Sequence, residues 1–353
     1  MRLDLFDYRL PQELIAQQPA ETREGSRLLV VDCERKAIEH HAFPDLGAYL
    51  EEGDCLVFNA SRVRRARLKG RKVGGGGEVE LLLLRAREDG AWEALARPAR
   101  RLRPGTSITF GRGEMVAEVI EKGERGNVLV HLRPSDLAAV EAAIERLGEV
   151  PLPPYIREEL AEPGRYQTVY AREVGSAAAP TAGLHFELST LRKLEKKGVR
   201  LAFIRLDVGL DTFRPIEKEE VEEHHVHAEE LELVGEACET INDARRDRRR
   251  IVAVGTTVVR ALESVARGGE VAPLRGRTGL FIYPGFRFQV VDSMVTNFHL
   301  PRSSLLLMVC AFAGRELVME AYNQAVEDRY RFLSFGDACY FHYAHGWRDP
   351  EET

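Results

Sequence analysis

The segment Ile251–Ser264, IVAVGTTVVRALES, places an apolar run, a glycine and a helical pattern directly after one another. Its four consecutive apolar residues, 251–254, are typical of a buried strand. After Gly255, apolar residues recur at the spacing of a helix. Strands that alternate with helices indicate an α/β fold, in which ligands bind at the carboxyl ends of the strands.

The same alternation runs through the chain from Tyr155 onward. Further helices are predicted at 187–197, 234–249, 303–313 and 315–328, and further strands at 199–208 and 280–283. Near the amino terminus, apolar runs predict strands at 27–32 and 55–58, and a proline opens a short predicted helix at 11–17. Together these elements predict a core domain built on a largely parallel sheet.

A different pattern separates these two parts. Several short strands alternate there with glycine-rich turns, which is typical of a small β-barrel or sandwich. The predicted strands are 78–85, 92–96, 107–110, 115–120 and 127–132, and a helix at 137–147 and the stiff linker PLPP at 151–154 follow them. We therefore predict an α/β core domain of residues 1–66 and 151–353 with an inserted β domain of residues 67–150.

The composition is typical of a soluble protein, since 30% of the 353 residues are charged and 44% are hydrophobic. The five cysteines form no C-x-x-C pair, which favours free thiols in a reducing compartment. No signal-peptide pattern opens the chain, and the longest apolar run, 305–313, is too short to cross a bilayer. We therefore expect a cytoplasmic protein with no membrane partner. Because the net charge is −6, binding to nucleic acid would depend on a local basic patch.

Small residues mark the first candidate site, GSAAAPTAGLHF at 175–186. They precede a predicted helix, where free backbone N–H groups suit a carboxylate, a phosphate or a hydroxyl. Thr181 and Gly183 lie at this entrance, and His185 can titrate near neutral pH. The alternative is a tight turn in which His185 is hydrogen-bonded and inert.

Two further candidate sites follow predicted strands. Gly255-Thr256-Thr257 either binds an anion or a hydroxyl at the start of the helix, or supplies only a threonine cap. Asn297 and His299 end the extended segment DSMVTNFHLP at 292–301 and form either a polar pocket wall or a capped loop. No G-x-G-x-x-G follows a strand, which argues against a Rossmann-type dinucleotide or methyltransferase site.

Histidines and arginines form the remaining clusters. The segment EEHHVHAEE at 222–230 contains three histidines, but no second Cys/His cluster supports a metal site. Catalytic histidines and a solvated acidic loop are the two interpretations. Basic residues gather at 62–72, 97–103 and 245–250. The first two clusters flank or lie in the predicted β domain, where they are either solvated faces or contacts to phosphates.

Many motifs in one order resemble the S-adenosylmethionine:tRNA ribosyltransferase-isomerase family of queuosine biosynthesis. They include SRLLVVD, LVFNASRVRRARL, PLPPYI, YQTVYA, GSAAAPTAGLHF, GLDTFRPI, EEHHVHAE, IVAVGTTVVRALES, FIYPGF, VDSMVTNFHLP and YRFLSFGDA. The resemblance implies a barrel-like α/β core with an inserted antiparallel β-barrel. It also implies a reaction in which the ribosyl part of S-adenosylmethionine is transferred to 7-aminomethyl-7-deazaguanine at the tRNA wobble position and isomerised. The products are epoxyqueuosine-tRNA, adenine and methionine.

The resemblance further implies which residues carry this reaction. Candidates for proton transfer are His185, His227 and His299, with Glu229 as a weaker one. Residues expected to hold S-adenosylmethionine are Thr181, Gly183, Gly255, Thr256, Thr257, Arg260, Tyr283, Asn297 and Phe298. Among these, Tyr283 and Phe298 would stack on a base, and Arg260 would meet a carboxylate or pair with Glu263. Arg62, Arg67, Arg100 and Arg101 would meet tRNA phosphates. S-adenosylmethionine is then a co-substrate, and neither a metal nor a permanently bound cofactor is expected.

The chain departs from the family pattern at Asp207, Asp211, Ala60 and Val226, where the family often has His, Gly, Asn and Met. A catalytic role of that histidine would not transfer to Asp207. Two other functions are compatible with the sequence: an S-adenosylmethionine-dependent tRNA methyltransferase and a non-catalytic RNA-binding protein. A monomer and a homodimer are equally compatible with it.

Overall fold

The computed structural model describes residues 1–87, 89–209, 216 and 218–343. The chain divides into two compact units, which we call the core unit, Met1–Arg62 with Pro153–Thr353, and the inserted unit, Val63–Leu152. Each unit has its own hydrophobic core. Among the described residues, no helix combines the length and the apolar character that crossing a bilayer requires.

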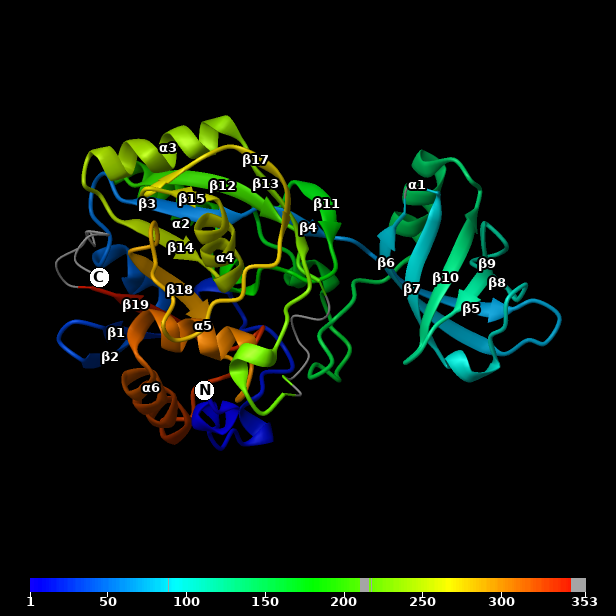
Figure 1. Ribbon diagram of the computed structural model, residues 1–353, viewed down its shortest axis with the longest axis horizontal. Helices are drawn as coiled ribbons and strands as arrows, with labels where there is room; N and C mark the ends of the chain where they lie inside the picture. Colours follow the sequence, from blue (N-terminus) through cyan, green and yellow to red (C-terminus); the bar gives the residue numbers. More distant parts are fainter. Residues whose placement is uncertain (88, 210–215, 217, 344–353) are drawn as a thin grey trace. The chain divides into compact units, whose positions relative to one another are not determined.

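A nine-stranded sheet runs through the core unit in the order β17-β13-β12-β3-β14-β18-β19-β1-β2 (Figure 1). Its strands are β1 Arg27–Asp32, β2 Ala37–Ala42, β3 Cys55–Asn59, β12 Arg200–Leu206, β13 Glu229–Leu233, β14 Ile251–Val254, β17 Leu274–Thr278, β18 Ser293–Asn297 and β19 Ala338–His342. The four neighbouring strands β12, β3, β14 and β18 are parallel. Their carboxyl ends therefore meet at one end of the sheet.

The prediction of a largely parallel sheet holds for these four strands and for the pair β1–β19, and it is wrong for the remaining pairs. The pairs β17–β13, β13–β12, β18–β19 and β1–β2 are antiparallel. A helical pattern between two strands shows that they are connected, but not in which direction the second strand enters the sheet. Strands β18 and β19 are joined through two helices and still run antiparallel.

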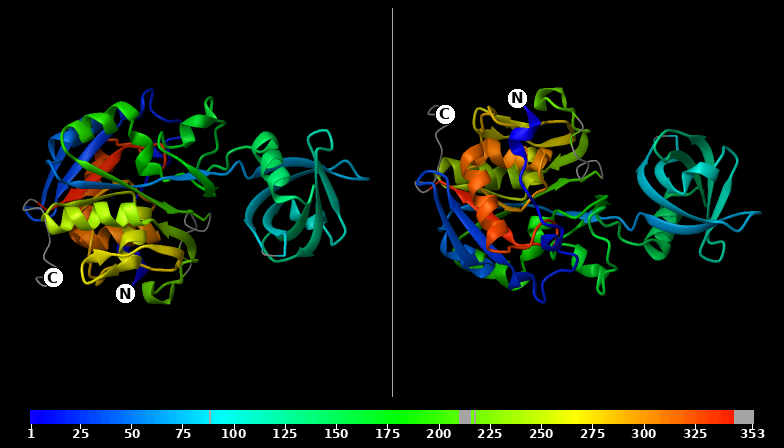
Figure 2. Two further views of the ribbon diagram at one scale, coloured as in Figure 1. Left: turned by 90° about the horizontal axis from the view of Figure 1, so that it is seen from above. Right: turned by 90° about the horizontal axis from the view of Figure 1, so that it is seen from below.

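Alternate residues of the strands belong to two different cores. Leu29 and Val31 pack into the larger core, whereas Leu28 and Val30 pack into the smaller one, because successive side chains of a strand point to opposite faces. The larger core is covered by α3 Gly235–Arg246, α4 Thr256–Val265, α5 Ser304–Ala313 and α6 Arg315–Glu327, and the smaller by α2 Leu188–Lys196 and the 3-10 helices Phe43–Ala48 and Thr181–His185. Figure 2 shows α2 and α3 on opposite sides of the sheet.

Two predicted elements of the core unit do not form. The expected helix at 11–17 is reduced to one 3-10 turn, Gln12–Leu14, because Ile15 is drawn into an isolated bridge with Phe332. The expected strand at 280–283 makes no strand pairing; its apolar side chains pack against the larger core instead. Two-stranded sheets pair β4 Ser61–Val63 with β11 Glu173–Ser176 and β15 Ala266–Arg267 with β16 Glu270–Val271.

Six antiparallel strands close into a barrel in the inserted unit, in the order β10-β7-β6-β5-β8-β9. They are β5 Arg67–Lys72, β6 Glu78–Ala86, β7 Ala91–Arg97, β8 Ser107–Phe110, β9 Met115–Lys122 and β10 Asn127–Arg133, and α1 Leu137–Leu147 packs its apolar face onto their core. The sequence pattern predicts no strand at β5, because basic residues occupy its outward positions. Gly70 in it lets the Phe110 ring approach, since a Cβ there would lie 2.6 Å from that ring. The predicted α/β fold with an inserted antiparallel β-barrel is confirmed.

Candidate functional site

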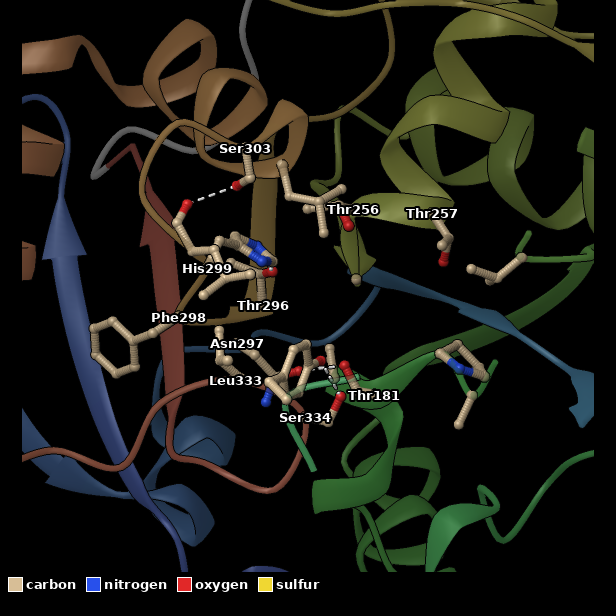
Figure 3. A pocket seen from close by; sticks show the side chains of 18 of the residues that line it. Thr181, Thr256, Thr257, Thr296, Asn297, Phe298, His299, Ser303, Leu333 and Ser334 are labelled. Carbon is tan, nitrogen blue, oxygen red and sulfur yellow. Dashed lines mark hydrogen bonds between the residues drawn. The ribbon is translucent and has the colours of Figure 1, made fainter. Parts of the chain in front are cut away.

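A cavity of about 80 Å³ lies in the core unit beyond the carboxyl ends of β14 and β18 (Figure 3). We call it the main cavity. Its walls are residues 179–182, 255–257, 296–301, Tyr155, Val208, Ser303, Leu305, Leu333 and Ser334. Hydroxyl, amide and imidazole groups share this wall with apolar side chains, which is typical of a site for a small organic molecule.

Two helices begin at the wall of the main cavity. Helix α4 follows Gly255, whose φ of 97° favours glycine, and within the described residues no side chain caps this helix start. Helix α5 is capped by Ser303, whose hydroxyl accepts a hydrogen bond from the Leu306 N–H. Because helix starts present free N–H groups and the positive end of the helix dipole, an anionic group is favoured here. The predicted anion or hydroxyl site at Gly255-Thr256-Thr257 therefore lies on this cavity.

A chain of hydrogen bonds, which we call the relay, runs from this wall into the interior. The Thr181 hydroxyl donates to Asn297 Oδ1 at 2.8 Å, and Asn297 Nδ2 lies 3.0 Å from His185 Nε2. The other ring nitrogen of His185, Nδ1, lies 2.8 Å from the Ser26 hydroxyl. Because an amide nitrogen only donates, Nε2 accepts, and Nδ1 of the neutral ring carries the proton that bonds Ser26.

His185 therefore lies behind the wall of the main cavity. Its ring is 5% exposed and stacks on Phe43 with the centroids 5.0 Å apart. Burial, with Arg331 and Arg23 nearby, lowers the pKa of His185 to about 4. The predicted proton-transfer role does not fit this position, because both ring nitrogens are used and the ring does not line the main cavity. The geometry instead gives His185 a positioning contact to Asn297.

His299 is the imidazole on the wall of the main cavity (Figure 3). Its Nε2 lies 2.9 Å from the Thr296 hydroxyl, and burial lowers the pKa of His299 to about 3. Its backbone is fixed by the hydroxyls of Tyr8, which donates to its carbonyl, and Tyr322, which accepts from its N–H. A neutral, firmly held imidazole is thus presented to the cavity.

The predicted residues His227, Glu229 and Arg260 are not part of the main-cavity lining. Arg260 forms an ion pair with Glu229, with an N–O distance of 2.9 Å, and donates to the carbonyl of His227. The alternative pairing of Arg260 with Glu263 is wrong. The Glu263 carboxylate instead accepts hydrogen bonds from the backbone N–H groups of residues 289–291.

Three other predicted ligand contacts are redirected by packing. The Phe298 ring points away from the main cavity (Figure 3). It packs on Tyr322, Tyr330 and Phe332, so it cannot stack on a bound base. The ring of Tyr283 contacts Phe281 outside the cavity lining. Gly183 is required by close packing, because a Cβ there would lie 1.9 Å from the Tyr170 hydroxyl.

Asp207, which stands where the family often has histidine, pairs with Arg205 at an N–O distance of 2.7 Å. It also lies close to Gly175, where a Cβ would come within 2.2 Å of its carboxylate. Of the other departures, Ala60 is buried and Val226 is half-buried. Asp211, with most of the motif GLDTFRPI, lies outside the described residues.

Three polar residues of this region were missed by sequence reasoning. The hydroxyls of Tyr155 and Ser334 are 2.7 Å apart, and both residues line the main cavity. Ser26 ends the relay at His185. All three belong to motifs that carry the family resemblance, PLPPYI, YRFLSFGDA and SRLLVVD, and this membership was the available signal.

The predicted phosphate contacts fall on both units. Arg100 and Arg101 are exposed in the 3-10 turn Ala99–Arg101 of the inserted unit. Arg67 of β5 pairs with Glu80 at an N–O distance of 2.7 Å, which offsets part of its charge, and Arg62 of β4 is exposed. In the part of the chain that the structure describes, no three His, Cys, Asp or Glu side chains are arranged to hold a metal ion.

Residues 3–341 match the family described as "Queuosine biosynthesis protein". The chain belongs to this family. This chain is similar to three relatives named S-adenosylmethionine:tRNA ribosyltransferase-isomerase. Each similarity covers 96% of this chain and 99% of the relative. Identity is 50% in Acetivibrio thermocellus, 52% in Moorella thermoacetica and 52% in Carboxydothermus hydrogenoformans. The predicted resemblance is thereby confirmed.

A solved structure of the family is also similar to this chain. The crystal structure of S-adenosylmethionine tRNA ribosyltransferase from Thermotoga maritima shares 39% identity, with a TM-score of 0.55. The similarity covers 96% of this chain and 99% of that one.

Proposed function

We propose that this chain catalyses the reaction for which its relatives are named. It transfers the ribosyl moiety of S-adenosylmethionine to 7-aminomethyl-7-deazaguanine at the tRNA wobble position and isomerises it, releasing adenine and methionine. The observation that carries the proposal is the identity of about half of all residues over nearly the full length of three ribosyltransferase-isomerases. The reaction takes place in the cytoplasm, and S-adenosylmethionine is a co-substrate that is not permanently bound.

The main cavity is the proposed site for S-adenosylmethionine. The methionyl carboxylate would lie at the starts of α4 and α5, where free N–H groups favour an anion. The adenosine part would lie against the apolar side chains Val208, Leu305 and Leu333, with hydroxyl groups within reach of Thr181 and Asn297. These residues fit a molecule with a charged end and a flat, largely apolar end.

The proposed chemistry begins next to the sulfonium, which acidifies the neighbouring ribose carbon. Loss of that proton and departure of adenine allow the amine of the deazaguanine to add at the anomeric carbon. A ribose oxygen then displaces methionine and closes the epoxide. The protein must supply proton transfer and exclude water.

His299 is the proposed proton-transfer residue, because its imidazole lines the main cavity. His185 is proposed as a positioning residue that acts through Asn297. Thr181, Thr256 and Thr257 are proposed to bind the substrate directly. His227 and Arg260 are proposed to have a structural role only. Arg260 holds this region together through its ion pair with Glu229 and its hydrogen bond to the His227 carbonyl.

The tRNA is proposed to contact the exposed Arg100 and Arg101. Phosphate contacts by arginine make affinity fall with salt, by a slope of about one for each contact. Reversing both charges with Glu should therefore weaken tRNA binding and flatten its salt dependence. Unchanged affinity and slope would show that this turn is only a solvated face.

A product assay tests the proposed function. The protein is mixed with S-adenosylmethionine and tRNA carrying 7-aminomethyl-7-deazaguanine, with unmodified tRNA as the control. Free adenine and methionine, together with a mass gain on the modified nucleoside, are expected only with the modified tRNA. Formation of S-adenosylhomocysteine instead would identify a methyltransferase, and no turnover would favour a binding protein.

A further inference from the structure

A second, smaller cavity of about 20 Å³ lies next to the main cavity, and Ser334 lines both. Its other walls are Pro19, Ala20, Thr22, Arg23, Ser26, Arg165, Leu184, His185, Phe335 and Gly336. Two guanidinium groups and three hydroxyl groups thus meet there, and this described lining contains no carboxylate. All of these residues belong to the core unit.

The two arginines are only partly satisfied by the protein. Arg23 donates to the carbonyls of Leu184 and Gln167, and Arg165 donates to the carbonyls of Glu21 and Ala20. Arg165 Nε is buried and has no hydrogen-bond partner within the described residues. Carbonyl oxygens accept hydrogen bonds but bring no negative charge. Glu187 offsets part of the Arg23 charge from a distance, and within the described residues neither arginine forms an ion pair.

A purely structural role explains only part of this arrangement. The bonds to carbonyls tie the segment 20–26 to residues 165–184, which a neutral donor can also do. Two half-buried like charges repel each other and are poorly solvated. Burial and the nearby Arg165 lower the pKa of Arg23, which reflects that cost. An oxyanion between the two groups would offset it through charge-assisted hydrogen bonds.

We propose that this second cavity binds an oxyanion, either a backbone phosphate of the tRNA or, in place of the position at the starts of α4 and α5, the carboxylate of S-adenosylmethionine. The two sources follow from the proposed function, whereas the oxyanion chemistry follows from the residues alone. The site is coupled to the main cavity, because Ser26 and His185 line the second cavity and continue through Asn297 to Thr181.

Calorimetric titration of the full chain with inorganic phosphate tests the site without any need for turnover. Arg165→Gln should weaken phosphate binding about tenfold, as expected for a lost charge-assisted hydrogen bond. Arg192→Gln, an exposed arginine of α2 with the same change in charge, should leave it within about twofold. Arg165→Lys keeps the charge but lacks the unpartnered Nε–H and the planar donor geometry, so it should also weaken phosphate binding and serves if Arg165→Gln does not fold. Equal phosphate affinity in a folded Arg165 variant and in the unmodified protein would overturn the proposal.

Substrate binding identifies the source of the anion. If the anion is a tRNA phosphate, Arg165→Gln should weaken tRNA binding and lower its salt slope by about one, with S-adenosylmethionine binding unchanged. If it is the carboxylate, Arg165→Gln should weaken S-adenosylmethionine binding and leave tRNA binding unchanged. No change for either substrate would overturn the assignment to a substrate. A chain that binds phosphate through Arg165 but forms no adenine would refute the proposed function and leave the oxyanion site standing.

Discussion

Asn297 links the walls of the two cavities, because its amide is hydrogen-bonded to Thr181 on one side and to His185 on the other. It is 3% exposed, so neither bond can be replaced by bulk water. The environment of a side chain thus decides its role more than its residue type does. His185 and His299 are both buried histidines, yet only His299 lines the main cavity.

Replacing Asn297 by Leu should reduce both stability and substrate binding. It leaves His185 Nε2 and the Thr181 hydroxyl without partners, which costs about 1–3 kcal/mol in the free energy of unfolding. S-adenosylmethionine affinity should fall with it. Asn242→Leu is the control, since the Asn242 amide also makes two hydrogen bonds, in its case to the backbone of Val271, but lies outside the main cavity. Denaturant unfolding and calorimetry measure the two effects; equal loss of affinity in both variants would contradict the prediction.

His185 should make stability depend on acid. Its pKa is 6.5 when unfolded and about 4 when folded, so between these values only the unfolded chain takes up the proton. The stabilisation is complete above pH 6.5 and is lost as the pH falls toward 4. The variant His185→Gln cannot take up this proton. The difference in free energy of unfolding between the unmodified protein and this variant should therefore shrink by up to about 3 kcal/mol on acidification. A difference that stays constant with pH would show that His185 does not titrate in this way.

At the scale of elements, the start of α4 joins a strand, a glycine and a helix in one continuous segment. Gly255 has φ and ψ of 97° and 149°, and Gly314, at the start of α6, has the similar values 84° and 136°. The nearest atom to an added Cβ at Gly255 is 3.6 Å away, and none lies within 4 Å at Gly314. Both substitutions therefore test backbone strain without steric clash.

Gly255→Ala and Gly314→Ala should each lower the free energy of unfolding by about 1–3 kcal/mol, because L residues rarely adopt this conformation. Only Gly255→Ala should also weaken S-adenosylmethionine binding, since only Gly255 lines the main cavity. Thermal unfolding and equilibrium binding of the matched pair measure this. Intact binding in Gly255→Ala would remove the α4 start from the proposed site.

At the scale of the whole molecule, the chain contains two units with separate cores. The barrel closes on itself, so its strands need no partner from the core unit to complete their hydrogen bonds. Tests of tRNA binding on the barrel and of S-adenosylmethionine binding in the core unit can therefore be designed separately.

Phe110→Ala should destabilise the inserted unit alone. The Phe110 side chain is 1% exposed in the barrel core, and its removal should cost about 3–5 kcal/mol. Differential scanning calorimetry should show one transition moving to lower temperature while a second stays in place. S-adenosylmethionine binding in the main cavity should persist. A single transition that moves as a whole would show that the two units unfold together.

The sequence by itself determined most of the local elements and the family of this protein. Apolar runs such as IVAV and RLLVVD become strands because their side chains are buried on both faces of a sheet. Short strands with glycine turns become the barrel, and polar residues after β14 and β18 line the main cavity. These features depend on neighbours along the chain, so pattern and spacing are enough to predict them.

Only the tertiary structure decided the direction of the strands and the partners of the polar side chains. Strand β19 pairs antiparallel with β18, the Phe298 ring packs into the core, and Ser26 meets His185. Arg23 and Arg165 line one cavity although they are far apart in the sequence. The physical reason is that burial, hydrogen-bond partners and pKa depend on groups brought together from distant segments, and these contacts exist only once the sheet and its covering helices have packed.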